Sequence, residues 1–489
     1  MMRRDPALAA GCRFDLLVIG GGVYGAALAQ QAARRGLATC VCEAGDFGCG
    51  ASWNSLRIVH GGLRHLQTLD VPRFLHAVRA RRGLARMFPS LLQPLSCLMP
   101  LYGQGLKRSS VMRLAMSVND ALSGARNVGV QPALHISPGR LLDAPETLHA
   151  FPLARASGLQ GAAVWGDLLM LSSERVVIEL LRDACRHGAV VLNYARVSEI
   201  RSSAGAVCGV RVHDAIGDGD FEVAARAVAD CSGARIGALN LDPGHCASSF
   251  TPSLAFNLLL DRPAPSEYAL AVAAPGRRMP VLFLVPLRTG VLAGTMHTPR
   301  TPGTVDAQPG EGEIEAFLAM LNAAIPGFDA RRAQVARIFA GLLPVAAARS
   351  VELVRSTTIV DHGRAGGPRG LCSVGGVKFS TAIEDARRAL AVMGWGVSKR
   401  ELQETPLHIS DATPLLINGD SAADADPVGV ASTLERVIEE ESVYCVDDLV
   451  SRRSNWGSTG SEPAGGAAVS AARAGLVRHC ASLVASEAR

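Results

Sequence analysis

The sequence has few aromatic residues and no long apolar run. Aromatic side chains make up 4% of its 489 residues, and no stretch reaches the roughly 18 consecutive apolar residues that a membrane-crossing helix requires. The apolar stretch that follows Arg3 and Arg4 ends at Arg13, which is too short for the apolar core of a secretory signal. We therefore expect a protein that is soluble or held at a membrane surface.

Patterned cysteine is also missing. The twelve cysteines are scattered from Cys12 to Cys480 without a C-x-x-C pair, whereas disulfide frameworks and zinc sites depend on close, regular spacing. Cys40 and Cys42 lie two residues apart on an expected strand, where packing on one face accounts for them. The pattern predicts buried thiols in a reducing cytoplasm and no metal site.

Charge of one sign is scarce as well. The formal net charge is +5, which does not favour nucleic acid, because its binders usually cluster lysine and arginine on one face. Basic residues do surround the apolar run from Leu91 to Tyr102, namely Arg73, Arg79, Arg81, Arg82, Arg86, Lys107, Arg108 and Arg113. This segment is either a solvated helix face with a loop or a peripheral contact with anionic lipids at the cytoplasmic membrane face.

Apolar residues that favour compact folding are abundant. They make up 48% of the chain against 19% charged residues, and the length exceeds what a single core usually organises. Apolar periodicity predicts the main helices at Arg73–Met87, Ser110–Leu122, Glu174–His187, Ile314–Ile325 and Thr381–Val392. It predicts strands at Val190–Ile200, Cys208–His213 and Phe221–Cys231, and a hairpin formed by Val281–Val285 and Gly290–Thr295.

The first strong motif is Gly20-x-Gly22-x-x-Gly25, with Glu43 following 23 residues after the first glycine. The first glycine of such a motif turns the chain, the second admits a pyrophosphate, and the third lets a helix and a strand pack closely. The acidic residue accepts hydrogen bonds from a ribose. The flanking strand, helix and strand are expected at Phe14–Ile19, Ala26–Arg35 and Leu37–Cys42. Together they predict a dinucleotide site.

FAD and NAD share this unit, so the choice between them needs a second signal. The turn Asp230-Cys231-Ser232-Gly233 follows an apolar run and is typical of the second strand-to-glycine turn of FAD proteins. A later glycine turn leads into an expected helix, whose N-terminus would direct its positive end at the flavin. NAD enzymes normally keep their unit contiguous. FAD is therefore favoured, with further contacts from Ser232, Gly233, Gly375, Gly376, Lys378, Phe379 and Ser380.

A more specific resemblance lies between Glu43 and Leu66. Glu43-Ala44-Gly45-Asp46, a serine-containing loop and Arg57-Ile58-Val59-His60-Gly61-Gly62-Leu63-Arg64 resemble the FAD-dependent glycerol-3-phosphate dehydrogenase family, part of the DAO-type FAD oxidoreductase superfamily. The likeness extends from Asp15 to about Leu390 and resumes at Asp447-Asp448-Leu449-Val450-Ser451-Arg452-Arg453. It implies an α/β fold with a Rossmann-like FAD-binding domain, an interleaved antiparallel β-sheet substrate domain and a small C-terminal helical cap domain.

The resemblance also implies the domain boundaries. An N-terminal tail is expected over residues 1–13, followed by FAD-binding parts over about 14–90, 165–240 and 345–400. The substrate-domain parts are expected over about 91–164 and 241–344, a linker over 401–427 and the helical domain over 428–489. Each main domain would thus be assembled from separated segments of the chain.

The resemblance assigns roles around the cofactor. Gly20, Gly22, Gly25 and Glu43 would hold the ADP half, and Val197 would lie near the adenine. The pyrophosphate and flavin tunnel would be lined by Ser52, Ser55 and Arg57, and the isoalloxazine ring would rest against Gly61 and Gly62.

On the substrate side, Arg64 and Lys378 match the family's cationic positions and would anchor an anionic molecule. His65 and His297 are candidate bases for the proton that leaves its hydroxyl group. The alternative is structural: the cations would pair with carboxylates at a domain boundary, and the histidines would be bystanders.

The chain departs from the family around the expected substrate. Leu343, after Gly341-Leu342, stands where the family has an arginine, which removes a bidentate partner for phosphate. The other departures are His65 for an aromatic residue, Leu254 for a histidine, Met296-His297 within a Gly-Thr-Thr-Asp segment, Ser172-Ser173 for an acidic pair, and Val377 for a glycine. FAD binding rests on backbone geometry, so these changes bear on the recognition of a small phosphorylated polyol.

Three functions follow from these patterns. The first is an FAD-dependent dehydrogenase that moves a hydride from a hydroxyl-bearing anionic substrate to flavin N5 and passes electrons to a quinone or another acceptor. The second is an amine or amino-acid oxidase of the same superfamily. The third is a flavin-binding protein without catalysis.

Overall fold

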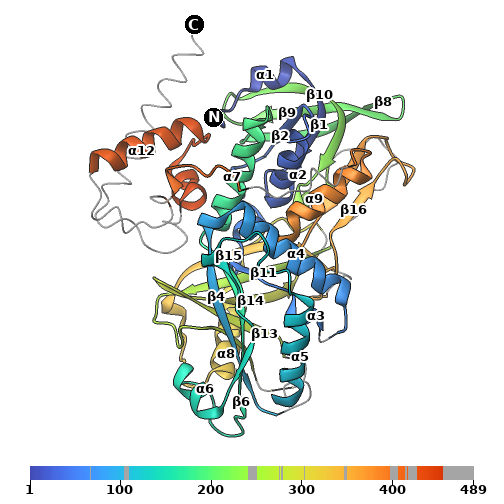
Figure 1. Cartoon of the computed structure of the whole chain (residues 1–489). Coiled ribbons are helices and arrows are strands. Elements are labelled where there is room, and N and C mark those ends of the chain that lie inside the picture. The colour runs from blue at the N-terminus through green and yellow to red at the C-terminus, as the bar shows by residue number, and fades with distance from the viewer. Residues whose placement is uncertain are drawn as a thin grey trace.

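The computed structural model describes residues 1–66, 68–103, 109–239, 251–274, 276, 279–301, 303–345, 350–396, 406–413, 416 and 427–454. Within these ranges the chain forms two sheets that lie one above the other in Figure 1, with helices packed around them. A small helical part at the C-terminal side contacts the upper sheet's helices. The α/β class with a dinucleotide-type sheet and a second, antiparallel sheet is confirmed.

The first sheet carries the parallel strands expected around the glycine motif. Its spatial order is β16 (Thr358–Asp361), β17 (Leu371–Gly375), β10 (Gly219–Asp230), β1 (Arg13–Ile19), β2 (Thr39–Cys42) and β7 (Val190–Leu192). All neighbours pair in parallel except β16. The antiparallel strands β8 (Ala195–Ser203) and β9 (Ala206–Asp214) extend from β10. The carboxyl ends of four adjacent parallel strands, β17, β10, β1 and β2, therefore meet at one edge.

Both faces of the first sheet are covered, which explains why its strands lack alternation. Leu16 and Val18 of β1 pack into the core formed with three helices, whereas Leu17 and Ile19 point to the opposite core beneath β8 and β9. The three helices are α2 (Val23–Ala33), α7 (Ser173–Arg186) and α9 (Ala382–Val392), which lie together in Figure 1. A strand buried on both faces needs apolar residues at successive positions.

The second sheet is largely antiparallel and forms the lower part of Figure 1. Its order is β15 (Val335–Pro344), β11 (Pro252–Leu260), β14 (Gly290–Pro299), β13 (Val281–Leu287), β12 (Ala269–Ala273), β4 (Leu92–Leu101), β6 (Gly161–Met170) and β3 (Ile58–Val59), with β5 (Arg140–Leu142) beside β6. The expected hairpin is confirmed, because β13 and β14 pair around Arg288 and Thr289. One face is covered by α8 (Glu311–Ala324), whose Phe317 meets Phe256 edge to face.

Shorter elements connect the sheets. The helices are α1 (Pro6–Gly11), α3 (Leu63–Leu66), α4 (Val71–Met87), α5 (Ser109–Leu122), α6 (Ala144–Ala150) and α12 (Pro427–Glu440). Short 3-10 turns are η1 (Ala51–Trp53), η2 (Pro89–Leu91), η4 (Pro132–Leu134), η5 (Gly233–Arg235), η6 (Arg332–Gln334) and η7 (Phe379–Thr381), and η9 (Asp448–Arg453) is a π-helical turn. Chain segments alternate between the two sheets, as an interleaved arrangement requires. The domain boundaries stay predictions, and residues 455–489 of the expected cap lie outside the described residues.

Helix α1 lies within the expected N-terminal tail, and the side chain of Met2 is fully buried. Two local expectations were wrong. The strand expected at Val190–Ile200 is broken by Tyr194, whose φ of 53° lets its amide reach the carbonyl of Gly45. The thiols are also not uniformly buried, since four of the ten described ones are exposed: Cys12, Cys49, Cys208 and Cys445.

The apolar run expected to meet lipid is instead part of a sheet. Residues 92–101 form β4, paired with β6 and β12, and Leu98 is fully buried. Arg81, from the same segment, is buried in an ion pair with Asp167. Because this run pairs with strands on both sides within the sheet, it does not form a surface for contact with lipids. Among the described residues, no helix combines the length and apolar character needed to cross a membrane.

Candidate functional site

The glycine motif lies at the carboxyl end of β1, as the strand-turn-helix pattern predicted. Gly20 has a φ of 99°, which favours glycine, and a Cβ atom added to Gly25 would lie 1.9 Å from the carbonyl oxygen of Gly20. Helix α2 starts directly after Gly22, which has no side chain to cap it, and the amide of Val23 donates to Ser52 Oγ at 2.9 Å. A helix N-terminus whose backbone can be approached closely suits a pyrophosphate, because its amides and its dipole attract negative charge.

Glu43 sits at the end of β2, beside the motif. Its Oε2 accepts a hydrogen bond from the Gly21 amide at 2.6 Å, and its Oε1 accepts one from the Gly45 amide at 2.8 Å. Burial raises the pKa of Glu43, and the nearby charge of Asp46 adds to this, while the two amides oppose it. The two amides therefore fix the carboxylate in position. In dinucleotide-binding folds of this kind, the acid at this position accepts hydrogen bonds from the ribose.

The two downstream glycine turns reach the same edge. Ser232 and Gly233 follow β10, and the Ser232 hydroxyl donates to the buried carboxylate of Asp230 at 2.5 Å. Gly375 and Gly376 follow β17, which pairs with β10. The structure thus brings together segments separated by more than 300 positions in the chain, as the FAD interpretation requires.

Tyr24 is a site residue that the sequence reasoning missed. A Cβ atom at Gly376 would lie 1.7 Å from the Tyr24 ring, so only glycine lets the two segments touch. The Tyr24 hydroxyl donates to the carbonyl of Lys378 at 2.9 Å, and burial raises the pKa of Tyr24 to about 12. Beyond Lys378 come Phe379 and Ser380 in η7, which runs into α9. Tyr24 therefore ties the glycine motif to the start of that helix.

The serine-containing loop joins the two sheets. Asn54 donates to the carbonyl of Ala255 at 2.6 Å, and its side-chain oxygen accepts from Asn257 at 2.7 Å. Ser55 Oγ accepts from the amide of Arg57, which has a φ of 62°. The guanidinium of Arg57 is buried and donates to the carbonyl of Leu171, and burial lowers its pKa. Arg57 thus lies beneath the loop, whereas Ser52 reaches the glycine motif.

Val197 remains a predicted adenine neighbour. It lies on β8, whose first residue, Ala195, donates its amide to the carbonyl of Glu43 at 2.8 Å. The side chain of Val197 packs in the core below the first sheet, and its backbone pairs with Val212. The strand thus starts beside Glu43, although Val197 itself points into the core.

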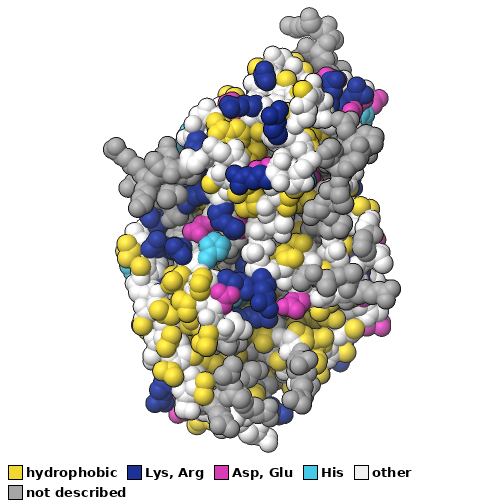
Figure 2. Space-filling view, turned by 90° about the vertical axis from the view of Figure 1, so that its right-hand side faces the viewer, with side chains coloured by type: hydrophobic (Ala, Val, Ile, Leu, Met, Phe, Trp, Pro, Cys, Tyr) yellow, Lys and Arg dark blue, Asp and Glu magenta, His cyan; other side chains and the backbone are white. Residues whose placement is uncertain are grey.

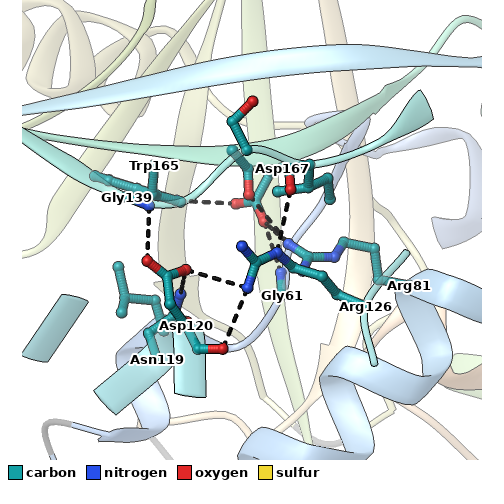
Figure 3. Close-up of a pocket in the computed structure, with 12 residues that line it drawn as sticks. Gly61, Arg81, Asn119, Asp120, Arg126, Gly139, Trp165 and Asp167 are labelled. Atoms are coloured by element: carbon teal, nitrogen blue, oxygen red, sulfur yellow. Dashed lines mark hydrogen bonds and ion pairs between the residues drawn. The ribbon is translucent and has the colours of Figure 1, made fainter. Parts of the chain in front are cut away.

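The loop expected to face the flavin is supported from behind by a buried carboxylate. Asp167 Oδ1 accepts from the amide of Gly61 at 2.7 Å and from Arg81 Nη1 at 2.7 Å, and its Oδ2 accepts from Trp165 Nε1 at 3.1 Å, as Figure 3 shows. A Cβ atom at Gly61 would collide with the Arg81 guanidinium, and Gly62 has a φ of 86°. Backbone hydrogen bonding and glycine geometry together fix this loop.

His60 shares the same carboxylate and was not singled out from the sequence. Its Nδ1 lies 3.1 Å from Asp167 Oδ2, and its ring contacts Phe283. Burial alone would raise the pKa of Asp167, but the hydrogen bond with His60 and the charge of Arg81 hold it below its usual value. The carboxylate of Asp167, whose pKa is lowered, orients the half-exposed His60 ring.

The cleft beside this carboxylate is polar and small. It has a volume of about 280 Å³ with its open mouth and is lined partly by an ion pair between Asp120 and Arg126 (Figure 3). The Asp120 carboxylate also accepts from the Gly139 amide. Such a volume lies at the lower limit of small-molecule pockets and is far too small for a dinucleotide. The cleft is therefore not the cofactor site, and the residues that line it support the Gly61–Gly62 loop.

The predicted substrate-side residues His65 and Lys378 do meet. Lys378 Nζ lies 2.9 Å from His65 Nε2, although the two residues are 313 positions apart. Partial burial and the positive charges of Lys378, Arg73 and Arg64 lower the pKa of His65 to about 4. Partial burial and the same two arginines also lower the pKa of Lys378. Arg73 is thus a further member of this cationic cluster that the sequence did not indicate.

The cationic cluster lies at the boundary between the two sheets. His65 and Arg64 belong to α3, Arg73 to α4, and Lys378 precedes η7 below α9. Figure 2 views the face that carries α3, α5 and β16, and Lys and Arg side chains gather across its middle with a histidine among them. A site at this boundary can combine a cofactor from one sheet with a substrate held against the other.

The register of the second sheet corrects one expected substrate position. Leu254 pairs with Leu342, and both point into the core under α8, as does Met296 opposite Phe256. Leu254 therefore cannot replace a substrate-binding histidine, because neighbouring residues of a strand point to opposite faces. The opposite face is the one that meets the serine-containing loop, since a Cβ atom at Gly341 would lie 2.7 Å from Ala51.

His297 and Leu343 do lie on the loop-facing side. His297 pairs with Ala255 and Leu343 with Ser253, which places both on the face that carries Gly341. His297 Nδ1 is buried without a hydrogen-bond partner among the described residues, and burial lowers its pKa. Leu343 thus lies on the face that meets the serine-containing loop, and His297 makes no hydrogen bond with His65 or Lys378 among the described residues.

These features are typical of a dinucleotide-binding protein in which a parallel sheet carries the glycine motif and an antiparallel sheet faces it. A family model described as FAD dependent oxidoreductase matches residues 15–381, and the chain belongs to that family. The glycine cradle, the acid that follows β2 and the start of α2 at Gly22 fit the ADP half of FAD. FAD is its cofactor, and the resemblance stated from the sequence is confirmed.

Relatives narrow the comparison. Glycerol-3-phosphate dehydrogenase 1 of Mycobacterium tuberculosis is 28% identical over 493 residues, covering 92% of this chain and 93% of its own. Alpha-glycerophosphate oxidase of Lactococcus lactis is 29% identical, covering 68% of this chain and 54% of its own. Both relatives carry names of enzymes that act on glycerol phosphate.

Solved structures share the fold. The glycerol-3-phosphate dehydrogenase of Bacillus halodurans, complexed with FAD, has a TM-score of 0.65 at 19% identity and covers 91% of this chain and 87% of its own. The glycine oxidase of Geobacillus kaustophilus has a TM-score of 0.55 at 19% identity, covering 81% of this chain and 99% of its own. The fold is therefore shared with a glycerol-3-phosphate dehydrogenase and with a glycine oxidase.

The His65 environment predicts a specific titration. Protonation of His65 should occur near pH 4, because burial and three cations oppose it, against roughly 6.5 in the unfolded chain. The unfolded chain then binds the proton first, so this group lowers the stability of the fold as pH falls from 6.5 towards 4. In Lys378→Met the midpoint of the His65 titration should rise, because one of the opposing charges is removed. Carbon-13 NMR of the histidine side chains measures this titration, and His65→Asn identifies the His65 signal. A wild-type midpoint above about pH 6 would contradict the prediction.

Proposed function

We propose that this chain oxidises a small anionic molecule that carries a hydroxyl group, with FAD as the hydride acceptor. The observation that supports this most is the cationic cluster of Arg64, Arg73, Lys378 and neutral His65, next to the glycine turn that leads into α9. Relatives named for glycerol phosphate support the substrate class. Cations whose charges act on one another in this way suit a phosphate or a carboxylate.

The cofactor would be held in the predicted orientation. Gly20, Gly22 and Gly25 would receive the pyrophosphate, and Glu43 would accept hydrogen bonds from the ribose. The start of α9, after Gly375 and Gly376, would direct its positive end at the flavin's pyrimidine edge. In this arrangement the Gly61–Gly62 loop would lie against the ring, and Asp167 would keep the loop in place through the Gly61 amide.

Leu343 would make the site less selective for a phosphate dianion. It lies on the loop-facing side of β15, where the family has an arginine, and it offers apolar surface instead of donors. A charge-assisted hydrogen bond contributes about 1.5–3 kcal/mol, so its loss weakens recognition at least about tenfold. Glycerol 3-phosphate would therefore be a poor substrate, and a larger or less charged anion would be preferred.

His60 is the best-placed base. Its Nδ1 faces ionised Asp167, so that nitrogen carries the proton and leaves Nε2 as an acceptor for the substrate's hydroxyl proton. His65 is less suited, because its Nε2 faces the Lys378 amine. His297 lacks any group that would orient its ring among the described residues. The proton would thus pass from the hydroxyl group to His60 beside the flavin-facing loop.

Oxidation of an amine or amino acid is the second candidate. Leu343 favours it, because a carboxylate needs fewer donors than a phosphate dianion, and the glycine oxidase fold is similar. Steady production of peroxide from oxygen would distinguish this activity from a dehydrogenase. A flavin-binding role without catalysis would leave the bound flavin oxidised with every substrate.

The substrate prediction is tested by anaerobic stopped-flow reduction of the bound flavin with polyol phosphates, hydroxy acids and amino acids. Glycerol 3-phosphate should reduce the wild type only at high concentration, and Leu343→Arg should lower the concentration needed at least about tenfold. The matched control is Leu342→Met, which changes the core-facing neighbour. Saturable reduction of the wild type at micromolar glycerol 3-phosphate would show that another residue replaces the missing arginine.

The proton-transfer role of His60 predicts a rate effect without cofactor loss. His60→Gln should slow flavin reduction by about 10²–10⁴-fold, because general bases contribute on that order, while the flavin spectrum stays intact. His297→Gln is the control and should change the rate less than about tenfold. If His297→Gln stops reduction and His60→Gln does not, the assignment of the base is wrong.

Electrons would leave to a quinone or another acceptor at the cytoplasmic membrane face, with peripheral contact. The apolar stripe on α5 suits such contact: Val111, Leu114, Val118 and Leu122 are 37%, 66%, 39% and 39% exposed. Leu114→Glu should reduce co-sedimentation with anionic vesicles at least about tenfold, since burying a leucine gains about 1.5–3 kcal/mol. Leu8→Glu, on exposed α1, should not. Equal sedimentation of both variants and the wild type would exclude this surface.

A further inference from the structure

We propose that Arg452 and Arg453, from the C-terminal helical part, are positioning residues for the ADP half of FAD, which they reach through Asp46 and Glu43. This inference rests on the proposed contact between Glu43 and the ribose. It gives a function to the Asp447–Arg453 motif, which the oxidation chemistry leaves unused.

Asp46 is the point at which the C-terminal part meets the cofactor side. It lies three residues after Glu43, in the loop that leaves β2, and is 2% exposed. Arg453 binds it through two bonds, Nη1 to Oδ2 at 2.6 Å and Nη2 to Oδ1 at 2.8 Å. Arg452 Nε donates to Oδ2 at 2.6 Å, and Asn193 Nδ2 to Oδ1 at 2.9 Å. Among the described residues, the side chains that donate to this carboxylate are therefore all distant from it in the sequence.

The arginines are themselves fixed by the C-terminal part. Arg453 is fully buried and donates to the carbonyls of Glu441 and Ser442, between α12 and η9. Arg452 pairs with Asp447 at 2.7 Å and Asp448 at 2.9 Å. The guanidinium groups cannot follow Asp46 if it moves, so the pairs hold the loop in one place.

The loop is gripped from its other side as well. The amide of Tyr194 donates to the carbonyl of Gly45 at 2.8 Å, and its hydroxyl donates to Asp448 at 2.5 Å. Gly45, between Glu43 and Asp46, donates its own amide to Glu43 Oε1. The C-terminal turn, the start of β8 and the ribose-binding acid thus form one continuous set of contacts.

Charge gives the arrangement its consequence for FAD. Two buried carboxylates lie close together, and the charge of Asp46 adds to the burial that raises the pKa of Glu43. Although burial alone would raise the pKa of Asp46, Arg453 and Arg452 hold it below its usual value. Because Arg452 and Arg453 balance the charge of Asp46, Glu43 can stay ionised, and an ionised carboxylate offers both of its oxygens as acceptors to the ribose hydroxyl groups.

The remaining charged and titratable groups around this pair belong to the same contact. Cys49 lies on the loop. Although the residue as a whole is exposed, the partial removal of its thiol from water and the charges of Glu43 and Asp46 raise the pKa of the thiol to about 12. The others are Tyr194 and Asp448, Cys445 beside both, and Glu441 with its partners Arg175 and Arg182. Among these groups, Arg452 and Arg453 are the cations that contact Asp46 directly.

The test is the pH dependence of FAD affinity in the full chain, measured by flavin fluorescence during titration of flavin-stripped protein between pH 6 and 9. In Arg453→Met the dissociation constant should rise at least about tenfold at pH 6.5 and less at pH 9, because unpaired Asp46 raises the pKa of Glu43 further. Adding Asp46→Asn to Arg453→Met should restore the wild-type pH profile. A loss of affinity that is equal at every pH, or that Asp46→Asn does not correct, would overturn the inference.

Two controls separate this effect from general loss of structure. Arg182→Met breaks an ion pair with Glu441 at the same interface without touching Asp46, and its pH profile should match the wild type. Arg452→Met keeps the bidentate pair and should give a smaller shift in the same direction, which preserves the test if Arg453→Met does not fold. Glu43→Gln tests the ribose contact itself: unchanged affinity there would refute the proposed function's placement of FAD, whereas weakened affinity with parallel arginine profiles would refute only this inference.

Discussion

The candidate cofactor site depends on the close packing of helix α2 against strand β1. At Gly25, any side chain would strike the carbonyl of Gly20, so α2 can start directly above β1 only with glycine there. That contact sets where the helix N-terminus points and leaves room for Ser52 to reach the amide of Val23. Glu43, the Ser232 turn and the Gly376 turn meet at one edge of the sheet. This edge suits a dinucleotide because the close packing of α2 on β1 brings the helix N-terminus to it.

Much of the cofactor side was readable from the sequence because it rests on local rules. Glycines at fixed spacing, an acid at a strand end and apolar runs without alternation each have one dominant structural cause. The second sheet was harder. Leu254 was assigned to the site, yet a shift of one residue along a strand moves a side chain to the other face, and no local signal fixes that register. The break at Tyr194, between β7 and β8, likewise has no glycine or proline beside it to mark it in the sequence.

The site residues that escaped the sequence are those defined by distant partners. His60 gained significance from Asp167, which lies 107 positions away, and Arg73 from its closeness to Lys378. The pairing of Arg453 with Asp46 spans 407 positions, and either residue alone is an ordinary surface charge in a sequence. Electrostatic sites of this kind become visible only when the fold has brought their members together.

The strand order also determines when the cofactor side can exist during synthesis. β1 and β2 are complete by residue 42, but their neighbour β10 ends at Asp230, and β17 ends at Gly375. A nascent chain therefore carries two strands with an unpaired edge while more than 170 further residues are made, and such edges invite association with other chains. Most of the chain must be synthesised before the edge that carries the glycine turns is complete, so β1 and β2 need protection from other chains until β10 and β17 have been made.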